Sequence, residues 1–239
     1  MIGLGTIVNT AAIAAAGFAG HRFGRLFDEE KQRSLNRVCG VCVLFIGIAG
    51  AMEGMLSVSD GALHSGRAMF VVLSLALGTL LGELLRIEDG FERFGEWLKR
   101  KTGNARDTRF VEAFVTASLT VSIGAMAVVG SIEDGLSGDY STLAVKAVLD
   151  FIIIAVMSSS MGKGAAFSAV PVFVFEGLMT LLSRLLAPLM TPPALANLSL
   201  VGSILIFCVG VNLVWGKLLR VANMLPGIVL AVLFAYLPL

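Results

Sequence analysis

The sequence predicts an all-α fold: a polytopic bundle of transmembrane helices, with about eight spans, in a single integral membrane domain over residues 1–239. The first supporting observation is composition, since 56% of the residues are hydrophobic and only 15% are charged. The mean hydropathy of +0.88 is too high for an ordinary soluble domain. The second is a series of apolar runs of roughly 18–22 residues, and the third is the placement of Lys and Arg between alternate runs.

Each apolar run is long enough to cross a hydrocarbon core about 30 Å thick as a helix, the state that pairs every backbone group within the segment. The first run has no basic residues ahead of it, so we expect it to be retained rather than cleaved as a signal peptide. A six-span arrangement with re-entrant segments is the alternative. The expected spans are 2–20, 38–57, 67–85, 110–132, 142–160, 165–185, 196–214 and 219–237.

Positive charge sets the expected orientation, because Lys and Arg are retained on the cytoplasmic side. Fifteen of the 18 basic residues fall between alternate runs, most of them in 21–37 and 86–109, and these two loops are therefore expected to be cytoplasmic. Both termini then lie outside, together with the acidic loop EDGLSGD at 133–139. The aromatic residues of the expected interfaces agree, with Trp97 and Trp215 at the inner boundary and Tyr140 and Tyr236 at the outer one.

The longest loop contains RIEDGFERFGEWLKRK at 86–101, in which apolar residues recur at helical spacing with charges between them. This pattern predicts a short amphipathic helix that lies on the inner leaflet. Its apolar residues are Ile87, Phe91, Phe94 and Leu98.

Glycine and proline mark the expected contacts and breaks. The patterns GAMEG at 50–54 and GTLLG at 78–82 predict close helix contacts. Pro171 is expected to kink the sixth span, and RVANMLPG at 220–227 suggests a local break in the eighth. Two internal similarities, 6–24 with 147–165 and 38–47 with 200–209, imply parallel and inverted repeats respectively, and the sequence leaves this question open.

Asp150 lies near the middle of the apolar run VKAVLDFIIIAVMSSS at 145–160. A central Asp disfavours insertion by roughly 2.5–3.5 kcal/mol, which cancels most of the favourable contribution of the apolar residues around it. Lys146 lies nearer the expected outer boundary and can snorkel, so Asp150 is expected to find partners or water on other helices. Glu176, well inside the sixth span, is the natural second member of a polar pathway; the alternative is that it only bonds a hydroxyl or backbone group between helices.

The fourth span carries one stripe of small or polar residues that begins with Glu112, Thr116 and Thr120 and continues through Gly124, Ala127 and Ser131. Such a stripe is either a close packing seam, whose hydroxyls bond their own carbonyls, or one wall of a hydrated path. Asn9 is an amide embedded in the first span that a neighbouring helix can satisfy. The candidate solute or ion pathway is therefore Asp150, Glu176, Glu112, Thr116, Thr120 and Asn9.

Several functions find no support in the sequence. The CGVC motif at 39–42 lies in a membrane-helix pattern, which favours small packing residues over a redox or metal role. SSSMGKG at 158–164 lacks the first glycine and the final Ser/Thr of a phosphate loop. Neither histidine falls within an expected span, so an intramembrane enzyme is the poorest reading. We expect no enzyme activity, cofactor, metal site or nucleic-acid partner.

Three stretches resemble a known family: GTIVNTAAIAAAGFAG at 5–20, FVTASLTVSIGAMAVVGSIEDGLSGD at 114–139 and RVANMLP at 220–226. Over essentially the whole chain the sequence is similar to the bacterial membrane proteins grouped as domain-of-unknown-function family 554. The resemblance implies a multi-pass protein of the bacterial inner (cytoplasmic) membrane, and it assigns no site residues.

The leading hypothesis is a secondary transporter or channel for a small solute or ion, with the buried acids Asp150 and Glu176 as a proton or cation site. The alternative is a membrane scaffold or regulatory partner protein without transport activity, which would dock another protein through its inner loops. The expected partners are the lipid bilayer and a small solute or ion, and the sequence is compatible with a homo-oligomer.

Overall fold

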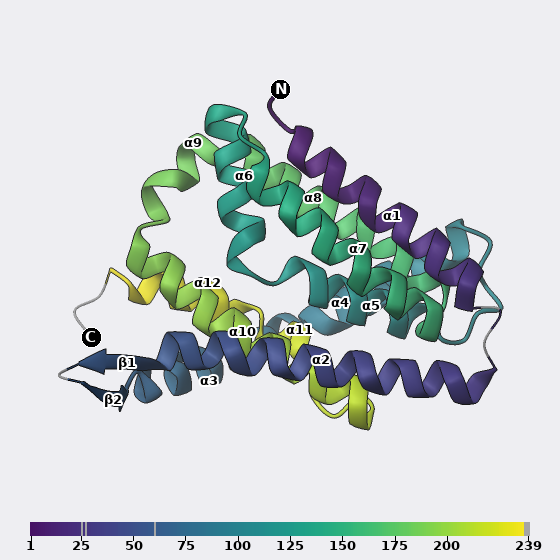
Figure 1. Ribbon diagram of the computed structural model, residues 1–239, viewed down its shortest axis with the longest axis horizontal. Coiled ribbons are helices and arrows are strands. Elements are labelled where there is room, and N and C mark those ends of the chain that lie inside the picture. Colours follow the sequence, from purple (N-terminus) through teal and green to yellow (C-terminus); the bar gives the residue numbers. More distant parts are fainter. Residues whose placement is uncertain (25, 27, 60, 237–239) are drawn as a thin grey trace. The chain divides into compact units, whose positions relative to one another are not determined.

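The computed structural model describes residues 1–24, 26, 28–59 and 61–236, and it is helical almost throughout (Figure 1). Leu237, the last residue of the expected eighth span, lies outside the described residues, as does Arg25 of the first loop. The elements in chain order are α1 (Leu4–Gly24), α2 (Glu29–Met55), β1 (Leu56–Ser59), β2 (Ala62–Ser65), α3 (Ala68–Leu85), α4 (Ile87–Lys101), α5 (Phe110–Ser122), α6 (Ala125–Ser137), α7 (Ser141–Met161), the 3₁₀-helix η1 (Lys163–Ser168), α8 (Ala169–Leu181), α9 (Ser183–Leu186), the 3₁₀-helix η2 (Ala187–Leu189), α10 (Pro192–Trp215), α11 (Val221–Met224) and α12 (Pro226–Phe234).

The predicted all-α membrane fold is confirmed, with a smaller number of strong spans than the eight expected. Five segments are long and apolar enough to cross a membrane, and α5 with α6 makes a sixth if this bent pair counts as one span. The two other expected spans correspond to α1 and to α11 with α12. The 21 residues of α1 include glycines, Asn9 and His21, which lower its hydropathy, and α12 has only 9 residues. The five segments are Glu30–Met55, Ala68–Leu85, Ser141–Met161, Lys163–Leu181 and Pro192–Trp215.

Large apolar side chains are exposed along the membrane-crossing helices, as expected where the surrounding solvent is lipid rather than water. On α2, Phe45 is 68% exposed and Met52 is 52% exposed. On α3, Leu84 is 81% exposed. The buried positions include polar and charged residues beside apolar ones.

The chain divides into two compact units, and the predicted single domain over 1–239 stays a prediction. The first unit comprises Met1–Cys39, Gly90–Ser122 and Met126–Pro188, and the second comprises Gly40–Asp89, Ile123–Ala125 and Leu189–Leu239.

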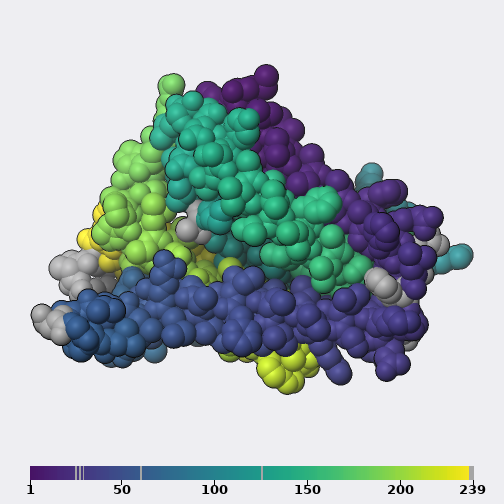
Figure 2. Space-filling model, viewed as in Figure 1, coloured from purple at the N-terminus to yellow at the C-terminus, as the bar shows by residue number. Residues whose placement is uncertain are grey.

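In the first unit, α1 and α7 run parallel and in close contact (Figures 1 and 2). Glycines of α1 form the contact, from Gly5 against Leu143 near the start of both helices to Gly24 against Ser159 near their ends. A Cβ atom on Gly20 would come within 2.2 Å of the carbonyl oxygen of Ala155. The absence of side chains on these glycines is therefore what allows the two backbones to approach.

Local signals define the ends of α7. The carboxylate of Asp139 accepts the backbone N–H of Ser141 at 3.0 Å in the first turn. Hydrogen bonds from Ser141 hold the pKa of Asp139, which lies in the preceding loop, below its usual value. The helix ends at Gly162, where φ is +99°, a conformation that favours glycine.

In the second unit, α2 packs antiparallel against α10, and α3 packs against α11 and α12. The predicted contacts of the two glycine patterns are confirmed: Gly50 and Gly54 face Ser203 and Leu200, while Gly78 and Gly82 face Gly227 and Asn223. Helix α10 begins where Thr191 accepts the N–H of Ala194, with prolines in its first turn.

The sequence interpretation missed a β-hairpin in the second unit. Strands β1 and β2 pair antiparallel from Leu56↔Ser65 to Ser59↔Ala62. Gly61 at the turn has φ of +75°, as two-residue hairpin turns require. The interpretation had treated these residues as the end of one span and a short loop.

Two predicted boundaries and one predicted kink are wrong. The loop expected at 21–37 is mostly helical, because α1 continues to Gly24 and α2 begins at Glu29. The span expected at 110–132 is broken: α5 ends at Ser122, α6 begins at Ala125, and the two helices are bent by 63°. Pro171 lies in the first turn of α8 and introduces no kink there, since the missing N–H of a first-turn residue needs no helical partner. The irregular segment η1 precedes it. The break predicted near Asn223 is confirmed between α11 and α12.

Candidate functional site

Four ionisable or amide side chains meet in the interior of the first unit: Asn9 from α1, Lys146 and Asp150 from α7, and Glu176 from α8. Asn9 and Glu176 are 0% exposed, Asp150 is 5% exposed and Lys146 is 6% exposed. We refer to these four residues as the buried polar cluster. Charged groups at such depth are rare in membrane proteins, because they must be removed from water.

The two residues of α7 are one helical turn apart and form an ion pair. Lys146 Nζ donates to Asp150 Oδ2 and lies 3.7 Å from Glu176 Oε1. The prediction that Lys146 snorkels away from Asp150 is therefore wrong. Its side chain is held inside because two carboxylates face it from two helices.

Asn9 bridges the two carboxylates. Its Nδ2 amide donates to Asp150 Oδ2 at 3.1 Å and to Glu176 Oε1 at 2.8 Å. The close glycine contact between α1 and α7 brings Asn9 within reach of α7, and α8 packs against α1 from another side. One amide thus fixes the spacing of both acids.

The break after α5 supplies a further ligand to Lys146. The carbonyl oxygen of Val121 accepts a hydrogen bond from Lys146 Nζ at 2.7 Å. In a continuous helix this carbonyl would accept the N–H of residue 125. Because α5 ends at Ser122 and Gly124 has φ of +149°, the carbonyl is available to a side chain.

Two acceptor atoms of the cluster have no hydrogen-bond partner among the described residues. They are Glu176 Oε2 and Asn9 Oδ1, and both are enclosed by protein. A buried acceptor without a donor is unfavourable by roughly 1–3 kcal/mol. The cluster is therefore short of donors, and a ligand that supplies one would satisfy it.

Polar contacts continue from the cluster toward the start of α1. The hydroxyls of Thr6 and Thr180 lie 3.3 Å apart. The carboxylate of Asp134, 0% exposed on α6, accepts the backbone N–H groups of Gly3 and Gly5 at 3.1 and 3.0 Å. This acid caps the otherwise unpaired N–H groups at the start of α1.

The structure brings together only part of the predicted pathway. Asp150, Glu176 and Asn9 lie in the cluster. Thr120 is buried, but its hydroxyl donates to the carbonyl of Thr116 within α5 at 2.8 Å, which agrees with a packing role. Thr116 is half-buried, and Glu112 is exposed at the other end of α5. The stripe expected along one helix is not continuous, since α5 ends at Ser122.

Sequence reasoning gave three buried charges no role in a site. Lys146 was assigned to the boundary, Asp134 was read as part of an exposed acidic loop, and Glu88 was read as one charge of the amphipathic helix. Position i, i+4 from Asp150 was the available signal for Lys146, because such residues share a helix face. For Asp134 and Glu88 the chain itself gave no signal.

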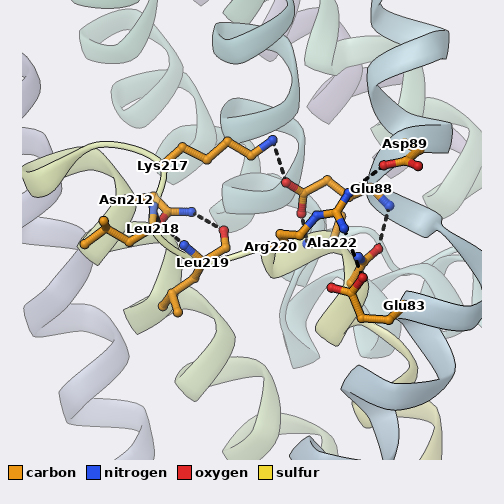
Figure 3. A network of polar contacts seen from close by, with 10 residues as sticks. Glu83, Glu88, Asp89, Asn212, Lys217, Leu218, Leu219, Arg220 and Ala222 are labelled. Atoms are coloured by element: carbon orange, nitrogen blue, oxygen red, sulfur yellow. Dashed lines mark hydrogen bonds and ion pairs between the residues drawn. The ribbon is translucent and has the colours of Figure 1, made fainter.

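Glu88 belongs to a second polar network, in the second unit (Figure 3). Its carboxylate, 2% exposed, contacts Lys217 Nζ at 2.7 Å and accepts the N–H of Ala222 at 3.3 Å. Its own backbone N–H donates to Asn223 at 2.8 Å. Arg220 donates to Glu83 at 3.0 Å and to Asp89 at 2.6 Å.

The same network orders the segment between α10 and α11. Asn212 accepts the N–H groups of Leu218 and Leu219, each at 2.9 Å, and donates to the Leu219 carbonyl at 2.7 Å (Figure 3). Every ionic group here has an opposite charge beside it. We therefore regard this network as a structural clasp between that segment and the junction of α3 with α4.

Within the described residues, no group of three or more His, Cys, Asp or Glu side chains is arranged to hold a metal ion. Cys39 and Cys42 lie on α2, where Cys39 is buried and Cys42 is exposed.

These observations define the class of protein: a helical membrane protein whose spans expose apolar side chains and whose interior holds an ionisable cluster. The chain belongs to the family described as "Protein of unknown function (DUF554)", whose model matches residues 4–236.

Two relatives are similar over nearly their full lengths. The chain is 26% identical over 226 residues to the "Uncharacterized membrane protein YdfK" of Bacillus subtilis (strain 168), covering 95% of this chain and 93% of the relative. It is 25% identical over 232 residues to the "Uncharacterized protein YqgA" of Escherichia coli (strain K12), covering 95% and 94%. No solved structure gives a significant match.

Proposed function

We propose that this membrane protein is a secondary transporter or channel for a small solute or ion, with Asp150 and Glu176 as its proton or cation site. The proposal includes residence in the bacterial inner membrane with both termini outside, and it involves no catalytic step and no cofactor. Its physical partners are then the lipid bilayer and the transported species.

The observation that carries the proposal is the buried polar cluster. Two carboxylates and one ammonium occupy positions that are at most 6% exposed, on helices whose outer faces are apolar. Each central charge disfavours membrane insertion by roughly 2.5–3.5 kcal/mol. Packing alone would be served as well by apolar residues, so the retention of three charges supports a functional role.

The irregular backbone around the cluster supports the same function. The α5–α6 break contributes the Val121 carbonyl, and the 3₁₀ segment η1 leads into α8, which carries Glu176. In many transporters, interrupted helices line the substrate and ion sites near the bilayer midplane.

The test is solid-supported membrane electrophysiology on proteoliposomes that contain wild type, Asp150→Asn or Glu176→Gln. Panels of inorganic ions, amino acids and organic acids serve as substrates. We expect a substrate-dependent current in wild type that falls to the level of protein-free liposomes in both variants. Glu96→Gln is the matched control, because its side chain is 50% exposed on α4, and this variant should keep the wild-type current. Wild-type currents in both cluster variants would contradict the assignment.

The alternative is a membrane scaffold or regulatory partner protein. The observation in its favour is α4, whose Trp97 and Phe94 stack on one another and remain 48% and 37% exposed. A scaffold should tolerate Asp150→Asn and should lose a stoichiometric partner when Trp97 is changed to Ala. Co-purification of wild type and Trp97→Ala distinguishes the two functions.

A further inference from the structure

We propose that the ion held by the buried polar cluster is a single proton, carried by Glu176 and taken from bulk water, and that Lys146 excludes metal cations from the same place. That this proton is also moved across the membrane rests on the proposed transport function. The proton site itself is argued from charge, hydrogen bonds and geometry.

The charges of the cluster do not balance without a proton. Lys146 contributes one positive charge, whereas Asp150 and Glu176 contribute two negative charges, so one negative charge is in excess. An unbalanced charge at this depth is far more unfavourable than a neutral group. One bound proton makes the cluster neutral.

No other described ionisable group in contact with the cluster corrects this excess. Asp134 of α6 is occupied by the first backbone N–H groups of α1. The elements packed against α8 present only distant or exposed groups: His21 and Arg22 at the far end of α1, Glu112 on α5, Lys163 of η1 bonded to Asn104, and Arg184 on α9.

Hydrogen bonds give the same stoichiometry. The ammonium of Lys146 has three N–H donors and the amide of Asn9 has two. Lys146 donates to the Val121 carbonyl and to Asp150 Oδ2, and Asn9 donates to Asp150 Oδ2 and Glu176 Oε1. The ammonium also lies 3.7 Å from Glu176 Oε1 as an ion pair. Glu176 Oε2 and Asn9 Oδ1 remain without a donor among the described groups. A proton on Glu176 Oε2 converts one of these unpaired acceptors into a donor.

The geometry assigns the proton to Glu176 rather than Asp150. Both acids accept a hydrogen bond from Asn9, but Asp150 Oδ2 also accepts one from the ammonium of Lys146, so the ionised form of Asp150 is the better stabilised one. Glu176 lies 3.7 Å from the ammonium, and its Oε2 atom has no donor among the residues that the structure describes. Glu176 forms the weaker ion pair with Lys146, so Glu176 is the acid that takes up the proton.

A metal cation does not fit this arrangement. Na⁺, K⁺ or Ca²⁺ needs several oxygen atoms directed toward it. Here the inner carboxylate oxygens are directed toward N–H donors, and the ammonium of Lys146 already occupies the space between the two acids. A second cation would be repelled at a distance of a few ångströms.

The test is infrared difference spectroscopy of the reconstituted protein between alkaline and acidic buffer. A protonated, buried carboxylic acid has a C=O stretching band separate from those of carboxylates and amides. We expect one such band in wild type, shifted by ¹³C-carboxyl labelling of glutamate and unchanged by ¹³C-carboxyl labelling of aspartate. Addition of NaCl, KCl or CaCl₂ at fixed pH should leave it in place. Labelled wild type needs no substitution, so the result does not depend on variants that fold.

Substitutions test the charge balance. Glu176→Gln leaves Lys146 and Asp150 as a neutral pair, and Asp150→Asn leaves Lys146 and Glu176 as another, so each variant should lose the band. Lys146→Gln leaves two acids without a cation, so both should protonate and the band should double. Glu96→Gln should keep the wild-type band.

The inference is overturned if labelled wild type shows no glutamic acid band, if the band survives in Glu176→Gln, or if Na⁺, K⁺ or Ca²⁺ removes it. A failure of the transport proposal would give a different result from a failure of the proton site. A glutamic acid band of the expected pattern together with no flux of any solute would leave the proton site intact and would remove only the transport function.

Discussion

Asn9 shows how much one buried amide can determine. It donates to both acids of the cluster, and no apolar residue of similar size can do so. Its neighbour Thr10 is the natural comparison, because the buried Thr10 hydroxyl has no hydrogen-bond partner within the described part of the chain. The two residues are adjacent in sequence, but only the Asn9 side chain forms hydrogen bonds with the cluster.

We therefore expect Asn9→Leu to lower the free energy of unfolding by about 1–3 kcal/mol, because two buried carboxylates lose a donor. Thr10→Val should be neutral or slightly stabilising, since it removes an unpaired hydroxyl while preserving shape. Thermal unfolding in detergent, followed by tryptophan fluorescence, measures both variants against wild type. Equal melting temperatures for Asn9→Leu and Thr10→Val would contradict the bridging role of Asn9.

The residues of the cluster differ in how far the sequence revealed them. Asp150 and Glu176 stood out because a carboxylate inside an apolar run is rare and unfavourable. Asn9 was included in the candidate pathway as an amide that a neighbouring helix can satisfy, but its two partners could not be named from the sequence. The prediction for Lys146 was wrong because it rested on the distance from the helix centre and on the weaker i, i+4 order of Lys before Asp. The position of Glu176 on α8, which cannot be read from the sequence, brings a second carboxylate to the ammonium of Lys146.

At the scale of elements, α1 and α7 depend on glycines that let two backbones touch. Gly20 lies where any Cβ atom would press on the carbonyl of Ala155, whereas Gly177 on α8 has no atom within 4 Å of an added Cβ. Both lie inside helices, so alanine is preferred at both by backbone propensity alone, by about 1 kcal/mol. Whether the alanine substitution stabilises or destabilises the protein therefore depends on whether the added Cβ atom meets another atom.

We expect Gly20→Ala to destabilise the protein by about 1–3 kcal/mol through overpacking, and Gly177→Ala to stabilise it by up to about 1 kcal/mol. Because α1 also carries Asn9, Gly20→Ala should reduce the proposed transport current as well. Melting temperatures in detergent measure the first effect, and electrophysiology measures the second. A stabilised Gly20→Ala would show that the two helices are farther apart than the glycine contacts imply.

The elements predicted best from the sequence are those in which length and apolarity agree. Residues 142–160 and 196–214 correspond closely to α7 and α10. The fourth span was mispredicted because apolarity continues across Gly124, while the backbone there adopts φ of +149° and ends the helix. The apolar composition of a segment indicates that lipid or protein surrounds it, but it does not predict the backbone dihedral angles at one residue. The hairpin was missed because its first residues, Leu56 and Ser57, were assigned to a span and the rest to a short loop, although apolar and polar residues alternate in LSVS at 56–59.

At the scale of the whole molecule, the distribution of Lys and Arg makes a prediction that the fold alone does not decide. Loops rich in basic residues stay in the cytoplasm, which places 86–109 inside and both termini outside. Any even number of spans leaves the termini on one side, whereas the five strongest segments taken alone would separate them. The side on which the C-terminal end lies therefore tests whether the weak or bent segments cross the membrane.

Single cysteines in a background without Cys39, Cys42 and Cys208 provide this measurement. We expect Ile2→Cys, Leu63→Cys and Tyr236→Cys to react with a membrane-impermeant maleimide in intact cells, and Arg106→Cys to react only after permeabilisation. Leu63 lies in the exposed hairpin and is separated from Arg106 by the single span α3, so this pair is the internal control. If Tyr236→Cys behaves like Arg106→Cys while Ile2→Cys reacts from outside, the number of spans between the two ends is odd, and a model with six or eight spans is excluded. If all three expected positions react from outside, then some combination of α1, the α5–α6 pair and α11–α12 must cross together with the five strong segments. The first unit would then present its cluster between fully inserted helices, where a single buried proton has the largest effect on the charge of the membrane interior.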